Sequence, residues 1–305
     1  MPKPSQQRPP SLKDIAQRTG VSVMTVSNVL NKQGNVGPET RKKIEEVIKE
    51  IDYVPFQAAR SLRTKQHRLV GLLIIDDNEA YLNDPILASI VAAINKKLSD
   101  LDYTLLLELS TTAKINEIGP FRRQLLDSMV VISCGNQRKL KALANTLDQN
   151  RVPKIYIQSV PEEKGPYTAI TQNDVEGGML LATHLLKKQT EHILILDTKL
   201  NWYPLIQRQK GLSTVFKKEG DLTVDVMKTK SENFDDIEAI LENYFDDHPY
   251  PDVIIGLTDL LAFAAMKVCQ DRGLKIPKNI RIAGFNGLFI GAYLSPRLTT
   301  IQSVP

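Results

Sequence analysis

From Ser11 to Asn31 the chain reads SLKDIAQRTGVSVMTVSNVLN, and this stretch predicts two short helices joined by a tight turn. The first is expected from Leu12 to about Arg18 and the second from Val23 to Leu30, with Gly20 permitting the turn between them. Small, polar and hydroxyl residues cover the exposed side of the second helix. This layout is typical of a helix-turn-helix, whose second helix enters the major groove of DNA.

Capping residues support these two helices and a third that follows them. Ser11 can cap the first helix with Asp14 at the capping-box position, and Ser22 can cap the second. Pro38 suits the first position of the third helix. The expected inward faces carry Leu12, Ile15, Ala16, Val26, Val29, Leu30, Ile44, Val47, Ile48 and Ile51. So small a core predicts a marginally stable unit unless DNA or a partner helps it.

The first 68 residues are basic, with 13 lysines and arginines against 6 aspartates and glutamates, while the rest of the chain holds 26 against 29. A basic head on a slightly acidic body indicates an anionic partner for the head alone. Residues 56–68, FQAARSLRTKQHR, are basic and helix-capable but have little to bury, so we expect them to order only on binding. The expected divisions are a disordered tail at 1–10, the head at 11–54, a hinge at 55–68 and an effector-binding and dimerisation domain at 69–305.

Beyond the hinge, apolar strands alternate with helices. The expected strands are residues 69–75, 103–109, 129–133, 154–160, 192–197, 252–257 and 280–285. The expected helices lie near residues 85–101, 116–127, 176–188, 206–219, 234–247 and 260–273. Such alternation predicts parallel sheets with helices on both faces. The number of strands suits two doubly wound lobes, with a ligand cleft at the carboxyl ends of the strands.

Composition and motifs argue against several other classes. Cys134 and Cys269 are the only cysteines and have no metal-like spacing, so we expect reduced thiols in a cytoplasmic protein. The first residues resemble no signal peptide, and no segment reaches the about 20 apolar residues that would span a membrane. The chain has no GxGxxG after its first strand, no phosphate-binding loop motif and no His/Cys cluster. We therefore expect no enzyme, no cofactor and no metal.

The residues from Leu12 to Thr64 resemble the lactose/galactose repressor (LacI/GalR) family, and those from Leu69 onward resemble its periplasmic-binding-protein-like regulatory domain. The resemblance rests on the motifs LKDIAQRTGVS, TVS and VLN, on TRKKIEEVIKEIDYVPFQAARSLRT, and on later RxxG, TDLLA, AGF and LTTI stretches. It implies an all-α helix-turn-helix head and an α/β regulatory domain of two parallel-sheet lobes. It also implies a homodimeric, possibly tetrameric, repressor that binds a pseudo-palindromic operator under the control of a small sugar or sugar phosphate.

The same resemblance places base-reading positions at Val23, Met24 and Asn28. Asparagine can bond the N6/N7 edge of adenine, and apolar side chains can contact a thymine methyl. The alternative is that Met24 packs internally and Asn28 is solvated. Short hydroxyl and amide side chains suited to phosphate contacts are Ser11, Ser22, Thr25, Ser27 and Asn31.

In the hinge, the resemblance makes Leu62 a wedge between base steps of the minor groove, flanked by Ala59 and Arg63. Such insertion costs a few kcal/mol of unstacking, which the bent contact recovers. The alternative is a linker with one buried leucine.

Effector contacts are implied at Arg208, Asp259 and Asn286, and a guanidinium suits bidentate capture of hydroxyls, carboxylate or phosphate. Trp202 and Tyr81 could supply a stacking face, although a packed core aromatic is an equal reading of Trp202.

The chain also departs from the family pattern. Thr258-Asp259 replaces the usual Asn-Asp pair, Asn286 replaces an aspartate, and Ile86-Leu87 replaces two aromatic residues. The sequence ends at Pro305, before the helix and strand with which relatives usually close, so we expect the domain to lack that end. Two other classes stay open: a solute-binding module that delivers a sugar, and a cytoplasmic enzyme on a doubly wound sheet.

Overall fold

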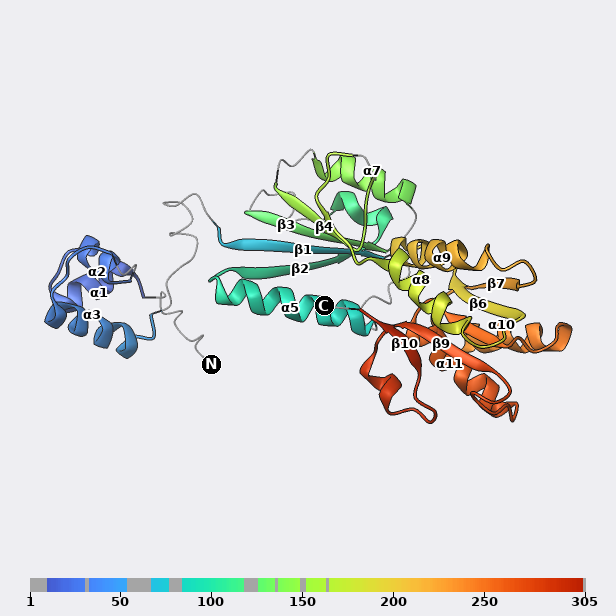
Figure 1. Ribbon diagram of the computed structural model, residues 1–305. Coiled ribbons are helices and arrows are strands. Elements are labelled where there is room, and N and C mark those ends of the chain that lie inside the picture. The colour runs from blue at the N-terminus through green and yellow to red at the C-terminus, as the bar shows by residue number, and fades with distance from the viewer. Residues whose placement is uncertain are drawn as a thin grey trace, which may run out of the picture. The chain divides into compact units, whose positions relative to one another are not determined.

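The computed structural model forms two compact units, one before and one after the boundary between His67 and Arg68 (Figure 1). The structure describes residues 10–30, 33–53, 67–76, 84–117, 126–134, 137–148, 152–162 and 165–303. The hinge residues Ala59, Leu62 and Arg63 lie outside these ranges, as do Asn31 and Tyr81.

The first unit contains three helices in its described part, and all three match the prediction. Their bounds are α1 Leu12–Thr19, α2 Val23–Leu30 and α3 Pro38–Glu50. The Asp14 carboxylate accepts hydrogen bonds from the backbone N–H and the hydroxyl of Ser11, at 2.7 and 2.6 Å. Gly20 ends α1 in the left-handed conformation at φ 71°, where a glycine is least strained. The Ser22 hydroxyl then accepts from the N–H of Thr25 at 3.0 Å and so caps α2.

The core of this unit consists of a few apolar side chains from the three helices. Among the described residues, the buried ones are Ile15, Ala16, Val26, Val29 and Ile44. The other predicted inward residues are partly buried against them, so the expected helical faces are confirmed. A core this small is sensitive to the loss of a single side chain.

The second unit begins with a parallel sheet whose described strands have the order β2-β1-β3-β4-β5. The strand bounds are β1 Leu69–Asp76, β2 Thr104–Ser110, β3 Ser128–Cys134, β4 Lys154–Ile157 and β5 Ala169–Ile170. Helices α5 (Pro85–Asp100) and α7 (Gln137–Asp148) cover opposite faces (Figure 1). Alternate β1 residues accordingly enter two separate cores, Leu72 facing α5 and Leu73 facing α7.

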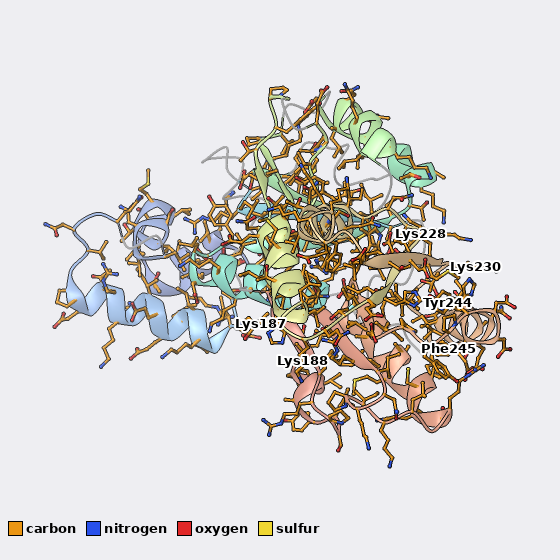
Figure 2. All side chains as sticks on the ribbon, turned by 45° about the vertical axis from the view of Figure 1, so that its right-hand side comes forward. Lys187, Lys188, Lys228, Lys230, Tyr244 and Phe245 are labelled. Carbon is orange, nitrogen blue, oxygen red and sulfur yellow. The ribbon has the colours of Figure 1, made fainter. Side chains whose placement is uncertain are left out.

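A second parallel sheet follows, with the order β10-β9-β8-β6-β7 in the described residues. The strand bounds are β6 His192–Thr198, β7 Thr223–Thr229, β8 Val253–Gly256, β9 Arg281–Asn286 and β10 Thr299–Gln302. The helices are α8 Asp174–Leu185, α9 Tyr203–Phe216, α10 Phe234–Asp247 and α11 Asp259–Asp271. One large core joins this sheet to its helices and includes Tyr244 and Phe245 of α10 (Figure 2).

Both sheets therefore share one topology, in which the first strand lies between the second and the third in chain order. In open sheets of this kind, ligands bind beyond the carboxyl ends of the strands, at the point where the strand order reverses. The prediction of two doubly wound parallel lobes is confirmed.

Sequence patterns missed helix α7 and strands β5, β7 and β10. Strand β7 is an edge strand with a partly exposed, alternating pattern, whereas the prediction relied on continuous apolar runs. The helix expected near 116–127 is replaced at its start by the 3-10 helix η2 (Thr112–Glu117), and residues 118–125 lie outside the described ranges. Within the part of the chain described, no helix combines the length and the apolar character needed to cross a membrane.

Candidate functional site

The outer face of α2 presents the residues predicted to read bases. The side chain of Met24 is 67% exposed and Val23 is also exposed, so the alternative in which Met24 packs internally does not hold in this unit. Asn28 is partly exposed on the same helix. Because these side chains do not pack in the core, they can contact a partner without disturbing the fold.

The predicted phosphate contacts differ in their accessibility. Ser22 is exposed, and its hydroxyl lies 2.9 Å from that of Thr25, which places both at the start of α2. Ser11 is partly exposed at the start of α1. Ser27 is buried on the inner side of α2, which leaves it poorly placed for a contact outside the unit.

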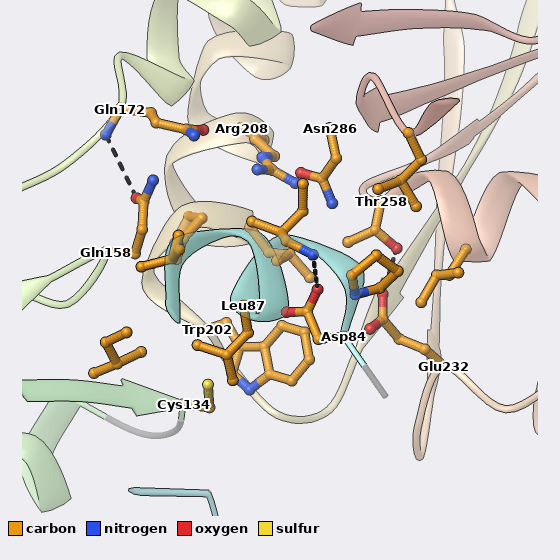
Figure 3. Close-up of a pocket in the computed structure, with 18 of the residues that line it drawn as sticks. Asp84, Leu87, Cys134, Gln158, Gln172, Trp202, Arg208, Glu232, Thr258 and Asn286 are labelled. Carbon is orange, nitrogen blue, oxygen red and sulfur yellow. Dashed lines mark hydrogen bonds between the residues drawn. The ribbon is translucent and has the colours of Figure 1, made fainter. Parts of the chain in front are cut away.

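The second unit contains a cavity between its two sheets, at the carboxyl ends of the strands (Figure 3). The first lobe supplies Asp84 after β1, Cys134 at the end of β3 and Gln158 after β4. The second lobe supplies polar and aromatic side chains: Trp202, Glu232 and Thr258 from the segments after β6, β7 and β8, Asn286 from the end of β9, and Arg208 from α9. Apolar side chains, among them Leu87 and Leu288, line the space between them.

Arg208 lines this cavity as predicted, but its guanidinium is already engaged by the protein. Its Nε donates to the Asp174 carboxylate at 2.9 Å, and its Nη1 donates to the carbonyl of Leu257 at 2.7 Å. The guanidinium also lies 4.9 Å from the centre of the Phe285 ring. Both partners of the ion pair are buried, and burial raises the pKa of Asp174 while Arg208 opposes the rise.

Asp259 has a different position from the one implied by the resemblance. Its carboxylate accepts hydrogen bonds from the N–H of Leu288 and the hydroxyl of Thr300, both at 2.6 Å. Asp259 is fully buried, and its neighbours Thr258 and Leu260 line the cavity instead. Burial raises the pKa of Asp259 to about 6, although these two hydrogen bonds act to lower it. In this structure Asp259 therefore holds the segment after β9.

Asn286 and Trp202 both line the cavity, so the structure brings together three of the predicted effector residues: Arg208, Asn286 and Trp202. Trp202 lies just before α9 and also packs against the core of the second lobe, which combines the two readings of this residue. Its indole N–H is buried and, within the described residues, has no hydrogen-bond acceptor. A buried donor without an acceptor is costly, and a bound ligand can satisfy it.

Two carboxylates in the cavity were not predicted from the sequence. Asp84 caps α5 and accepts from the N–H of Ile86 at 2.8 Å, and burial raises its pKa. Glu232 follows β7 and accepts a hydrogen bond from the Thr258 hydroxyl. Burial is the main reason why the pKa of Glu232 rises to about 7, and the nearby Asp84 adds to the rise. The only sequence signal was the Asp-Pro pair at the start of α5, which marks a helix start and not a binding site.

Neither cysteine forms a disulfide, and burial raises the pKa of both thiols. The described part of the chain also contains no group of three or more His, Cys, Asp or Glu side chains arranged to hold a metal ion.

Comparisons with known protein families match this architecture along most of the chain. Residues 11–55 match the bacterial regulatory proteins of the lacI family, and residues 68–304 match the periplasmic binding proteins and sugar binding domain of the LacI family. The chain belongs to the LacI family.

Individual relatives are distant but cover nearly the whole chain. The ribose operon repressor of Halalkalibacterium halodurans is 27% identical over 296 residues, which are 96% of this chain and 85% of the relative. The transcriptional repressor PurR of Aliivibrio fischeri is 28% identical over 305 residues, with 96% and 86% covered. The structure of the Lac repressor bound to ONPG aligns with a TM-score of 0.83 at 20% identity, over 97% of this chain and 88% of that one.

Proposed function

We propose that the protein is a cytoplasmic transcriptional repressor that binds a pseudo-palindromic DNA operator as a homodimer and responds to a small sugar. The observation that carries this proposal is the match of both units to the LacI family, with a cavity between the lobes of the second unit. The relatives' names describe repressors and regulators, so we infer that this chain acts by binding and not by catalysis.

Sequence reading is assigned to the outer face of α2. Val23, Met24 and Asn28 contact bases, and Ser11, Ser22, Thr25 and Asn31 contact phosphates. The exposure of Met24 and Val23 and the position of Ser22 and Thr25 at the start of the helix support this assignment. Two such helices in a dimer would enter half-sites about one helical turn apart.

Minor-groove contact is assigned to the hinge, with Leu62 as the wedge and Ala59 and Arg63 beside it. The variant that tests this wedge is Leu62→Ala. We expect it to weaken binding to the specific operator far more than binding to random duplex, because only the specific complex recovers the cost of unstacking. If the variant loses equal affinity for the operator and for random duplex, Leu62 does not act as a wedge.

Effector control is assigned to the cavity and its residues Arg208, Asn286 and Trp202. Two relatives connect this architecture with sugars. One is named a ribose operon repressor, and the structure of another, the regulator CelR, is a complex with cellobiose and aligns with this chain at a TM-score of 0.68. A ligand between the lobes would favour one lobe arrangement and so couple to DNA binding by about 1–3 kcal/mol.

The test is selection of duplex fragments from a random library by the purified full chain, followed by fluorescence anisotropy at two salt concentrations. We expect one enriched palindromic sequence that is bound at least about a thousandfold more tightly than random duplex. Affinity for both should fall steeply with salt because phosphate contacts release counterions. If no sequence is enriched at low salt, the proposed function is wrong.

A further inference from the structure

The charges around the cavity are strongly unbalanced. Asp84 and Glu232 line it directly, and Arg208 is the one lysine or arginine among the described lining residues. In the view of Figure 3, the two carboxylates lie on one side with Trp202, while Arg208 and Asn286 lie on the other. The guanidinium of Arg208 is paired with Asp174, so it offsets the charge of the two carboxylates only in part.

Other charged groups near Glu232 do not restore the balance. Asp76, at the end of β1, is buried and adds its negative charge, while Arg208 is the cation that acts on Glu232. Lys228, at the end of β7, is 40% exposed and paired with Asp197 at 2.9 Å (Figure 2). A carboxylate pair in a buried site is costly to ionise unless a cation joins it.

We propose that the effector is an amino sugar, a polyhydroxylated ring that carries a protonated amine, and that its ammonium group binds between Asp84 and Glu232. This inference rests on the proposed function and names the class of ligand. Each carboxylate uses one oxygen in the hydrogen bond described above, and its second oxygen can accept from the ammonium group.

Two further features fit the rest of such a ligand. The unpartnered indole N–H of Trp202 can donate to a ring hydroxyl, and the indole and leucine side chains offer an apolar surface to the ring. Gln158 and Asn286 supply amides that can donate to and accept from the remaining hydroxyls. A phosphate would instead meet two carboxylates and a guanidinium that is already paired, which argues against the sugar phosphate considered from the sequence.

The test measures binding to the full chain by calorimetry at pH 7. The probes are glucosamine, galactosamine and mannosamine, their N-acetylated forms and the matching hexose 6-phosphates. We expect at least one free amine to bind about tenfold or more tightly than its N-acetylated form, because acetylation removes the charge, and the phosphates to bind more weakly still.

Two variants locate the effect. Asp84→Asn keeps a good helix cap but loses the charge, and Glu232→Gln keeps an acceptor for Thr258. Each should remove most of the preference for the free amine, whereas Asp247→Asn, an exposed site at the end of α10, should not change it. Folding is checked by thermal denaturation at pH 8. The pKa of Glu232 is about 7 in the folded protein and lower in the unfolded chain, so the folded state loses stability as the pH rises from the lower value to the higher one. At pH 8 the Glu232→Gln variant lacks this cost and should melt no lower than the wild type.

Equal binding of amine and N-acetyl forms, tighter binding of a phosphate, or binding of no hexosamine would each overturn the amino-sugar assignment. The proposed function is judged separately by the DNA selection, which uses no ligand. A selected operator together with failure of every hexosamine would leave the repressor and reject the amino sugar.

Discussion

Helix α2 and the cavity between the lobes place their candidate contact residues in opposite settings. Met24 on α2 is 67% exposed, while Arg208 in the cavity is 4% exposed and bonded to two protein groups. A substitution on α2 should therefore change binding and leave folding almost untouched. A substitution at Arg208 should change both, because the partners that it leaves behind are buried.

The largest expected effect comes from Arg208→Ala. Removing one partner of a buried ion pair leaves the Asp174 charge uncompensated, so we expect the free energy of unfolding to fall by about 3–5 kcal/mol. Urea denaturation followed by the fluorescence of Trp202, the single tryptophan of the chain, reports on the second unit alone. Lys267→Ala is the control, since the Lys267–Asp271 pair is exposed on α11 and should change stability by less than about 1 kcal/mol. Similar values for both variants would mean that the Arg208 pair is not structural.

Next in size is Ile44→Ala in the core of the first unit. A buried isoleucine cut to alanine costs about 2–5 kcal/mol, which is a large share of the stability of so small a core. DNA binding by anisotropy and helix content by circular dichroism should both fall, while the Trp202 transition stays at its wild-type midpoint. Glu45→Ala, at the exposed neighbouring position, should leave all three unchanged. A shift of the Trp202 transition in Ile44→Ala would show that the two units do not unfold independently.

Asn28→Ala should have a smaller effect, confined to DNA. Loss of one bidentate base contact costs about 1–3 kcal/mol of discrimination, and the partly exposed side chain contributes little to folding. Anisotropy on the selected operator and on its single-base variants measures this loss. If affinity for random duplex falls as much as affinity for the operator, Asn28 contacts phosphate and not a base.

The smallest effect is expected at the start of α2, where Ser22 has two assigned roles. Ser22→Ala removes the cap on the Thr25 N–H and should cost about 1 kcal/mol of stability in the first unit. Ser22→Asp keeps a capping oxygen but places a negative charge beside the expected phosphate. The first unit of this variant should therefore melt at the wild-type temperature, while its affinity for DNA should be lower than that of the wild type. Wild-type DNA affinity in Ser22→Asp would exclude the phosphate contact.

The two regions also differ in how far the sequence predicted them. In the first unit, the caps at Ser11 and Ser22, the turn at Gly20 and the inward residues all agree with prediction. In the second, the strand series was largely foreseen, but edge strand β7 was missed. Glu232, in the segment that follows β7, was missed with it. Arg208, Asn286 and Trp202 were expected at the cavity and line it, whereas Asp259 supports the segment after β9.

By itself, the sequence determined the three-helix head and most of the series of strands and helices in the second unit, because capping and apolar periodicity act within a few residues of each other. Only the tertiary structure decided that Arg208 is paired with Asp174 and that Asp84 and Glu232 enter the same cavity. Each of these contacts joins segments that are distant in the chain: Arg208 reaches Asp174 where α9 packs against α8, while Asp84 and Glu232 share a cavity because the two sheets bring their carboxyl ends together. The charge of the cavity follows from that meeting, since burial and neighbouring groups, and not residue type alone, set the cost of each carboxylate.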